Sequence, residues 1–210
     1  MTGPAAAAAA RALRYDAWFD GPWGRHAWRV ETAAVLAALG PLAARRVADI
    51  GCGTGRLLGS LTRHGAQAVG VDGDPAMLAL AATRGRVARA DAHQLPLAGA
   101  SVDAAVTVAT LEFTADPARV LTEMARITRP GGRMVAAVLN PGSLWGILDQ
   151  PARRAPYASG CFLPRVDLLA LGLHEVAEKE AEAMSDPRGT SQPTPDGGIR
   201  QRDRRERHKS

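Results

Sequence analysis

The sequence predicts an α/β domain with a mostly parallel β-sheet, a Rossmann-like three-layer sandwich. Short apolar segments alternate with helical segments between residues 47 and 139, and this alternation favours a parallel sheet with right-handed crossovers. A glycine-rich turn, Gly51–Gly55, joins the first apolar segment to a helix. The length of 210 residues and a hydrophobic fraction of 46% suit one domain with a substantial core.

The first half of the expected sheet contains two strands, each followed by a helix. Val47–Ile50 is an apolar run that ends in glycines, and the helical segment Arg56–Arg63 follows it. Ala68–Val71 is the second strand, ended by an acidic turn. Pro75 is well placed as the first residue of a helix that runs to about Thr83.

The second half adds three more strands. Val87–Ala90 is short, whereas Val102–Val108 is continuously apolar and suits a strand buried on both faces. Pro117–Thr128 has its apolar residues at helical spacing. The prolyl-glycyl-glycyl sequence at 130–132 predicts a turn into a fifth strand, Arg133–Leu139.

Composition divides the chain into three parts. Residues 1–40 form an N-terminal lead and helical lid segment, with 1–12 expected to fray and Glu31–Leu39 expected to be helical. Residues 41–184 form the α/β domain. Residues 185–210 lack apolar periodicity, so we expect a disordered basic tail.

Residues 200–210, at the end of this tail, carry +4 of the net charge of +5. A nucleic-acid-binding protein should carry a basic face on its folded part, so no nucleic acid is expected. No apolar run of 18 residues and no charged leader are present, which predicts a cytoplasmic protein without a membrane span. Cys52 and Cys161 lack neighbours at metal-ligand spacing, so no metal is expected.

The first candidate site is the segment from Asp49 to Gly55. Its glycines, Gly51, Gly53 and Gly55, allow the backbone to approach a ligand. The third glycine comes one residue earlier than in the dinucleotide fingerprint. A sulfonium cofactor has no phosphate but carries a positive sulfur and an ammonium, so Asp49 could act on its amino-acid end, directly or through water. The alternative is a purely structural turn.

Two further carboxylates follow the next two strands. Asp72 is suited to accept hydrogen bonds from both ribose hydroxyls of an adenosine ligand, while Asp74 before Pro75 is the better helix cap. Asp91 could accept from the adenine amine, and the backbone N–H of Ala92 could reach a ring nitrogen. The alternative for each is a turn or cap role.

These motifs together resemble the class I S-adenosylmethionine (SAM)-dependent methyltransferases, small-molecule type, including the ubiquinone/menaquinone-type enzymes. The resemblance covers about residues 13–145 and rests on Asp49–Gly55, Val71–Met77, Ala90–Pro96, Ser101–Val106 and Arg126–Gly132.

The resemblance implies SAM as the cofactor and a small-molecule methyl acceptor as the substrate. It implies that Asp49 and the glycine loop, including Cys52, hold the methionine part, Asp72 the ribose, and Asp91 with Ala92 the adenine. It further implies that Met77 packs on the adenine face and that the backbone near Val108 lines the pocket.

Methyl transfer needs alignment of the acceptor more than a fixed set of catalytic groups, and a base only if the acceptor arrives protonated. His26 and Glu112 are the candidates for a catalytic role, although packing or a surface position is the alternative for His26. Tyr15, Trp23, Asn140 and Trp145 are the candidates for lining the acceptor site. Core packing of the lid is the alternative for Trp18, Phe19, Trp23 and Trp28.

The C-terminal part departs from the family's pattern. Pro164–Leu171 and Leu173–Ala177 are candidates for a last helix and strand, but no seventh strand is visible. An unpaired sheet edge is a liability, so a partner chain in a homodimer, a less stable fold, or an altered C-terminus remain open. Three other functions also remain open: a catalytically silent SAM-binding interaction protein, a nicotinamide-dependent oxidoreductase, and an RNA-directed methyltransferase.

Overall fold

The computed structural model describes residues 3–139, and the α/β prediction is confirmed over this range. Five parallel strands form one sheet in the order β3-β2-β1-β4-β5. The strands are β1 (Arg46–Ile50), β2 (Gln67–Asp72), β3 (Arg86–Arg89), β4 (Val102–Val108) and β5 (Thr128–Ala137). The helices are α1 (Pro4–Trp18), α2 (Pro22–Leu39), α3 (Arg56–Arg63), α4 (Pro75–Ala81), η1 (Leu111–Phe113) and α5 (Pro117–Ile127).

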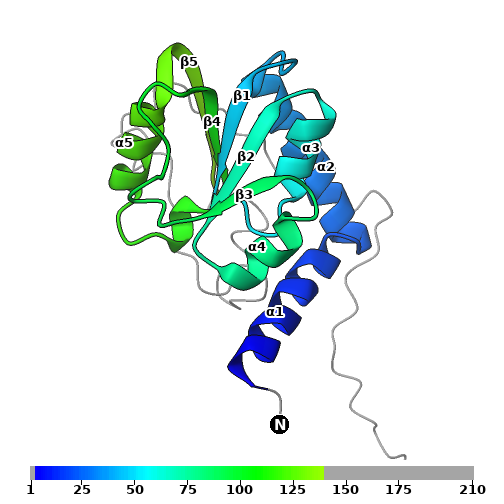
Figure 1. Cartoon of the computed structure of the whole chain (residues 1–210). Coiled ribbons are helices and arrows are strands. Elements are labelled where there is room, and N and C mark those ends of the chain that lie inside the picture. Colours follow the sequence, from blue (N-terminus) through cyan, green and yellow to red (C-terminus); the bar gives the residue numbers. More distant parts are fainter. Residues whose placement is uncertain (1–2, 140–210) are drawn as a thin grey trace, which may run out of the picture.

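Helices cover both faces of the sheet (Figure 1). On one face, side chains of α2 and α3, such as Leu39 and Leu58, pack with Val47 of β1. On the other face, α5 packs Met124 and Ile127 against the sheet. The core is therefore aliphatic, and it holds the carboxyl ends of the strands in fixed positions.

Two expectations were wrong. Residues 4–12, which were expected to belong to a frayed lead over 1–12, are helical: α1 begins at Pro4, and Ala12 is completely buried. The segment 130–132, expected to be a turn before the fifth strand, lies within β5. Pairing with β4 begins at Val102↔Thr128, shifts register, and continues from Ala104↔Arg133. Gly131, at φ 73°, accommodates the extra residues of this irregularity.

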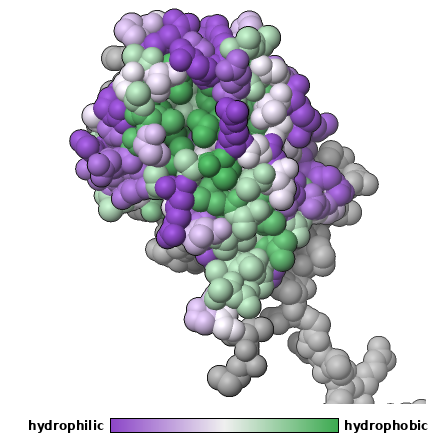
Figure 2. Space-filling model, in the orientation of Figure 1, coloured by the Kyte–Doolittle hydropathy of each residue, from purple (hydrophilic) through white to green (hydrophobic). Residues whose placement is uncertain are grey.

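The exposed residues of α1 are mostly alanines, and this helix extends as a largely hydrophobic projection below the more hydrophilic rim of the domain (Figure 2). No helix among residues 3–139 is long and apolar enough to cross a membrane. The expected helix and strand at 164–177, the basic tail 185–210, and Cys161 lie outside the described residues.

Candidate functional site

A pocket opens at the carboxyl ends of β1 and β4, which are adjacent in the sheet (Asp49↔Val106). The chain leaves β1 toward β2 on one side and leaves β4 toward β5 on the other. In open α/β sheets such a switch point is where ligands bind. The pocket is lined by Tyr15, Phe19, Trp28, Glu31, Asp49, Gly51, Cys52, Gly53, Thr54, Arg56, Leu57, Val108 and Ala109.

The glycine-rich loop needs its glycines because neighbouring elements approach it closely. Gly51 has φ 70°, and a Cβ there would lie 2.2 Å from Thr110 Oγ1, which itself donates to the Val108 carbonyl at 3.0 Å. Gly55 has φ 81°, and its Cβ would lie 2.8 Å from the Cα of Ala81 in α4. Side chains at either position would therefore push β4 or α4 away from the loop.

Asp49 is the most unusual group in this pocket. Its side chain is 2% exposed, and its Oδ2 has no hydrogen-bond partner among the described residues. Burial, followed by the charge of Asp72, raises the pKa of Asp49 to about 7, against a lowering hydrogen bond from Leu58 N–H. A buried carboxylate is stable only when it is protonated or paired, so this oxygen is suited to a cationic ligand group.

Asp72 and Asp74 make different contacts at the end of β2, and Asp74 has the helix-cap role that was expected of it. Asp74 caps α4, because its Oδ1 accepts from Ala76 N at 2.8 Å. Asp72 Oδ2 accepts from Gly53 N at 2.8 Å, and its Oδ1 accepts from Asp74 N at 2.8 Å. The cap role of Asp74 is thus confirmed, and Asp72 ties the end of β2 to the glycine loop.

The strand order places the three predicted cofactor carboxylates along one edge of the sheet. Asp49 is in β1, Asp72 ends β2, and Asp91 follows β3. The exposed Asp91 accepts a hydrogen bond from His93 N at 2.9 Å. Ala92, the next residue in the chain, and Met77 of α4 are both half-buried. Gly55, Asp72, Met77, Asp91 and Ala92 do not line the pocket described above, so an occupant touching them must extend beyond it.

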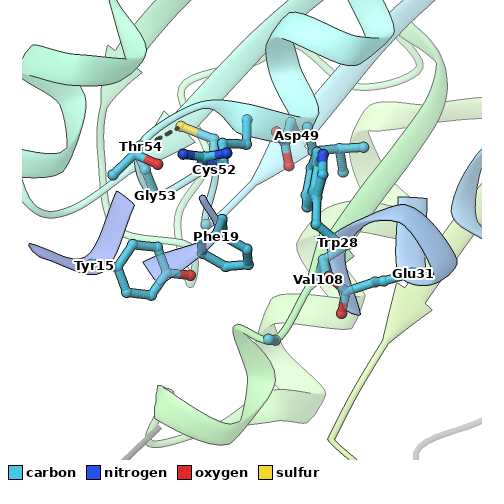
Figure 3. A pocket seen from close by; sticks show the side chains of 13 residues that line it. Tyr15, Phe19, Trp28, Glu31, Asp49, Cys52, Gly53, Thr54 and Val108 are labelled. Atoms are coloured by element: carbon cyan, nitrogen blue, oxygen red, sulfur yellow. Dashed lines mark hydrogen bonds between the residues drawn. The ribbon is translucent and has the colours of Figure 1, made fainter. Parts of the chain in front are cut away.

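The N-terminal helices supply an aromatic wall to the pocket. The sequence analysis named Tyr15 as a candidate for lining the acceptor site and gave core packing as the alternative for Phe19 and Trp28. Tyr15 and Phe19 meet edge to face at 5.4 Å, and Phe19 meets Trp28 in the same way at 5.9 Å. Figure 3 shows these rings opposite the glycine loop and Asp49. Trp23, which was expected to line the acceptor site, does not line the pocket.

Glu31 of α2 is a pocket residue that the sequence analysis missed. Its carboxyl group lies beside Trp28 and Val108 in Figure 3. Burial and then the charge of Glu112 raise its pKa to about 7. The sequence signal is the one charged residue between Val30 and Leu39, the mostly apolar second half of α2.

An ion-pair network fixes α1 against the glycine loop. Asp16 Oδ1 accepts from Thr54 Oγ1 at 2.7 Å, from Arg56 Nε at 2.8 Å and from Arg84 Nη1 at 2.7 Å. These hydrogen bonds hold the pKa of Asp16 well below its usual range despite the opposing effect of burial. The aromatic wall is therefore tied to the loop that it faces.

The other candidates take separate positions. His26 does not line the pocket, and its Nε2 is buried without a hydrogen-bond partner among the described residues. Glu112 is 3% exposed in η1, outside the lining but electrostatically coupled to Glu31. Cys52 lines the pocket, and burial raises the pKa of its thiol. Asn140 and Trp145 lie outside the described residues.

Comparison with known proteins shows what the chain is similar to. Residues 48–136 match the family model described as a methyltransferase domain. An uncharacterized methyltransferase of Mycobacterium bovis is 43% identical over 113 residues, which cover 52% of this chain and 43% of that protein. The chain thus spans less than half the length of this curated relative.

Solved structures share the fold over a larger part of the chain. A SAM-dependent methyltransferase from Thermotoga maritima, described as a possible histamine N-methyltransferase, has a TM-score of 0.68 and 30% identity, covering 78% of this chain and 76% of that one. The [4+2]-cyclase SpnF has a TM-score of 0.58 and 26% identity, covering 71% of this chain and 57% of that one.

Proposed function

Because the chain belongs to the SAM-dependent methyltransferases, we propose that it binds SAM at the carboxyl edge of the sheet and methylates a small-molecule acceptor. The observation that carries this proposal is the buried, unpartnered Oδ2 of Asp49 in a pocket framed by the glycine loop. An ammonium is the kind of group that such an oxygen can accept from, and SAM carries one at its amino-acid end.

The residues along the edge fit the rest of the cofactor in order. Asp49 and the loop of Gly51, Cys52, Gly53 and Gly55 hold the methionine part. Asp72 holds the ribose: each of its oxygens accepts one backbone hydrogen bond, and a carboxylate oxygen can accept more than one. Asp91 and Ala92 hold the adenine, with Met77 against its face, and Val108 lines the methyl end.

When bound, SAM supplies an activated methyl group, so the chemistry of transfer belongs to the cofactor. The protein has to position the acceptor and exclude water. Tyr15, Phe19 and Trp28 provide a hydrophobic wall for this purpose, and the Asp16 network holds the wall in place.

The direct test is incubation of the full chain with methyl-labelled SAM and a fractionated small-molecule extract, followed by mass spectrometry of labelled products. A labelled product that is absent with Asp49→Asn supports the proposal. Binding of SAM without any labelled product favours the second candidate, a catalytically silent SAM-binding protein. The likeness to a structure described as a [4+2]-cyclase supports keeping this candidate, since the same fold serves a protein with a different named activity.

A further inference from the structure

We propose that the acceptor is an amine, bound as its ammonium beside the carboxylate of Glu31, with the buried carboxylate of Glu112 outside the pocket lining adding negative charge. This inference rests on the proposed methyltransferase function and names the chemical class of its substrate. It depends on two acidic side chains outside the motifs that hold the cofactor, one on α2 and one on η1.

Glu31 brings a negative charge to the acceptor side of the pocket. It lines the pocket together with Trp28 and Val108 (Figure 3), and no hydrogen bond or ion pair to its carboxylate exists among residues 3–139. Val108 ends β4, the strand whose carboxyl end the cofactor's methyl group is proposed to approach. Glu31 therefore has no structural partner in the described protein and faces the place where an acceptor must lie.

Glu112 is a second acid, which is buried and lies outside the pocket lining. Its side chain is 3% exposed; its Oε1 accepts from the backbone N–H of Leu139, whereas its Oε2 is buried with no partner among the described residues. It follows β4 by four residues, and its charge acts on Glu31. A negative charge on Glu112 therefore disfavours an unpaired charge on Glu31, which a cationic ligand group in the pocket would offset.

The aromatic wall favours an organic cation. Trp28 presents its ring system to the same pocket, and ammonium groups are attracted to aromatic faces. The ring of Phe19 already has the guanidinium of Arg56 over it, 5.2 Å from the ring centroid. Carboxylates combined with aromatic rings recognise an amine better than an alcohol, a carboxylic acid or a phosphate.

Glu31 also supplies the proton transfer that an amine requires. An ammonium has no lone pair, so one N–H proton must pass to the Glu31 carboxylate, which leaves a neutral amine and a protonated Glu31. The amine nitrogen then forms the N–CH₃ bond as the S–CH₃ bond breaks, and the electron pair of that bond remains on sulfur. The product leaves as the methylated ammonium, and Glu31 releases the proton that it accepted to solvent.

The test measures binding rather than turnover. The full chain, saturated with S-adenosylhomocysteine, is titrated calorimetrically with ethylamine, cyclohexylamine and 2-phenylethylamine, and with the corresponding alcohols. At least one amine should bind about tenfold more tightly than its alcohol, as a charge-assisted hydrogen bond predicts. Glu31→Gln should remove that preference while the affinity for S-adenosylhomocysteine changes less than about twofold.

Asp103→Asn is the matched control, because it removes one carboxylate charge at the opposite end of β4, where Asp103 pairs with Arg46 and Arg129. It should retain the amine preference. The amine proposal is wrong if no amine binds more tightly than its alcohol, or if Glu31→Gln lowers the affinity for S-adenosylhomocysteine instead of the affinity for the amine. The proposed methyltransferase function stands in both cases. If S-adenosylhomocysteine itself does not bind to the folded protein, the proposed function fails first.

Discussion

The carboxylate of Asp72 at the end of β2 accepts a hydrogen bond from the backbone N–H of Gly53 at 2.8 Å. A single side chain thus joins the proposed ribose position to the loop that frames the methionine position. The two halves of the cofactor site are therefore mechanically linked before any ligand is present.

Replacing Asp72 should affect binding more than stability. Asp72→Ala loses both the loop contact and the proposed ribose acceptor, so SAM affinity should fall at least about tenfold, as expected for lost charge-assisted hydrogen bonds. Asp74→Ala is the control, because it removes the α4 cap and should lower the free energy of unfolding by about 1 kcal/mol with little change in affinity. Calorimetry and urea unfolding measure the two quantities. Equal affinities for SAM in both variants would argue against a ribose role.

Gly51 should be intolerant of a side chain. Gly51→Ala places a Cβ 2.2 Å from Thr110 Oγ1 at φ 70°, so the loop or the end of β4 must move and SAM binding should be lost. Gly131→Ala is a matched control, since Gly131 has φ 73° but no heavy atom within 4 Å of an added Cβ. It should cost only about 1–2 kcal/mol of backbone strain and retain binding. Similar behaviour of the two variants in thermal melts and titrations would contradict this account.

Asp16 should control the order of α1. Asp16→Ala leaves Arg56 and Arg84 without their shared carboxylate, and removal of one partner from a partly buried pair should cost about 2–4 kcal/mol. Asp20→Asn alters a partner of Arg56 that is 68% exposed, and should cost less than about 1 kcal/mol. Hydrogen exchange should show faster exchange of α1 amides in the Asp16 variant. Unchanged exchange there would mean that other contacts hold the helix.

Affinity for SAM should rise with pH up to about 7. Asp49 is neutral below its raised pKa of about 7, and an ammonium pairs only with the ionised form. Each unit of pH below this value therefore costs up to about a factor of ten in affinity. Calorimetric titrations of the wild type should show this slope, and Asp49→Asn should show a weaker, flatter dependence. An identical slope in the variant would assign the titration to another group.

Stability of the ligand-free protein should change with pH in the opposite direction. Asp49 and Glu31, with pKa values raised to about 7, keep a proton in the folded state that the unfolded chain loses above about pH 4.5. Protonation of these two carboxyl groups therefore contributes fully to the free energy of unfolding below about pH 4.5, and this contribution is lost as the pH rises through about 7. Because the pKa of Asp16 is lowered, its contribution to stability is lost only when the pH falls below about 4, outside the range compared in this experiment. The Tm should therefore be higher at about pH 5 than at about pH 8, and the difference should shrink in the Asp49→Asn, Glu31→Gln double variant.

The fold, and the edge of the sheet that carries the proposed cofactor residues, could be predicted because their signals are local. Alternating apolar runs, the Gly51–Gly55 loop and the strand-end positions of Asp49 and Asp72 are all visible within a few residues. The strand order then brings them to one edge, as a parallel sheet requires.

The acceptor side could not be predicted in the same way, because it depends on contacts between distant segments. Phe19 and Trp28 look like core residues until the Asp16 network is seen to place them over the pocket. Glu31 is an ordinary helical residue in the sequence, and only its burial near Glu112 distinguishes it. The irregular start of β5 was missed because a glycine pair predicts a turn, whereas pairing with β4 keeps this segment in the sheet.

Calorimetric titration with SAM tests the central claim most directly, using the wild type, Asp49→Asn and the Asp103→Asn control. The account predicts binding in the micromolar range for the wild type and the control, and affinity at least about tenfold weaker for Asp49→Asn. A folded wild type that does not bind SAM, or an Asp49→Asn variant that binds as tightly as the wild type, would contradict it.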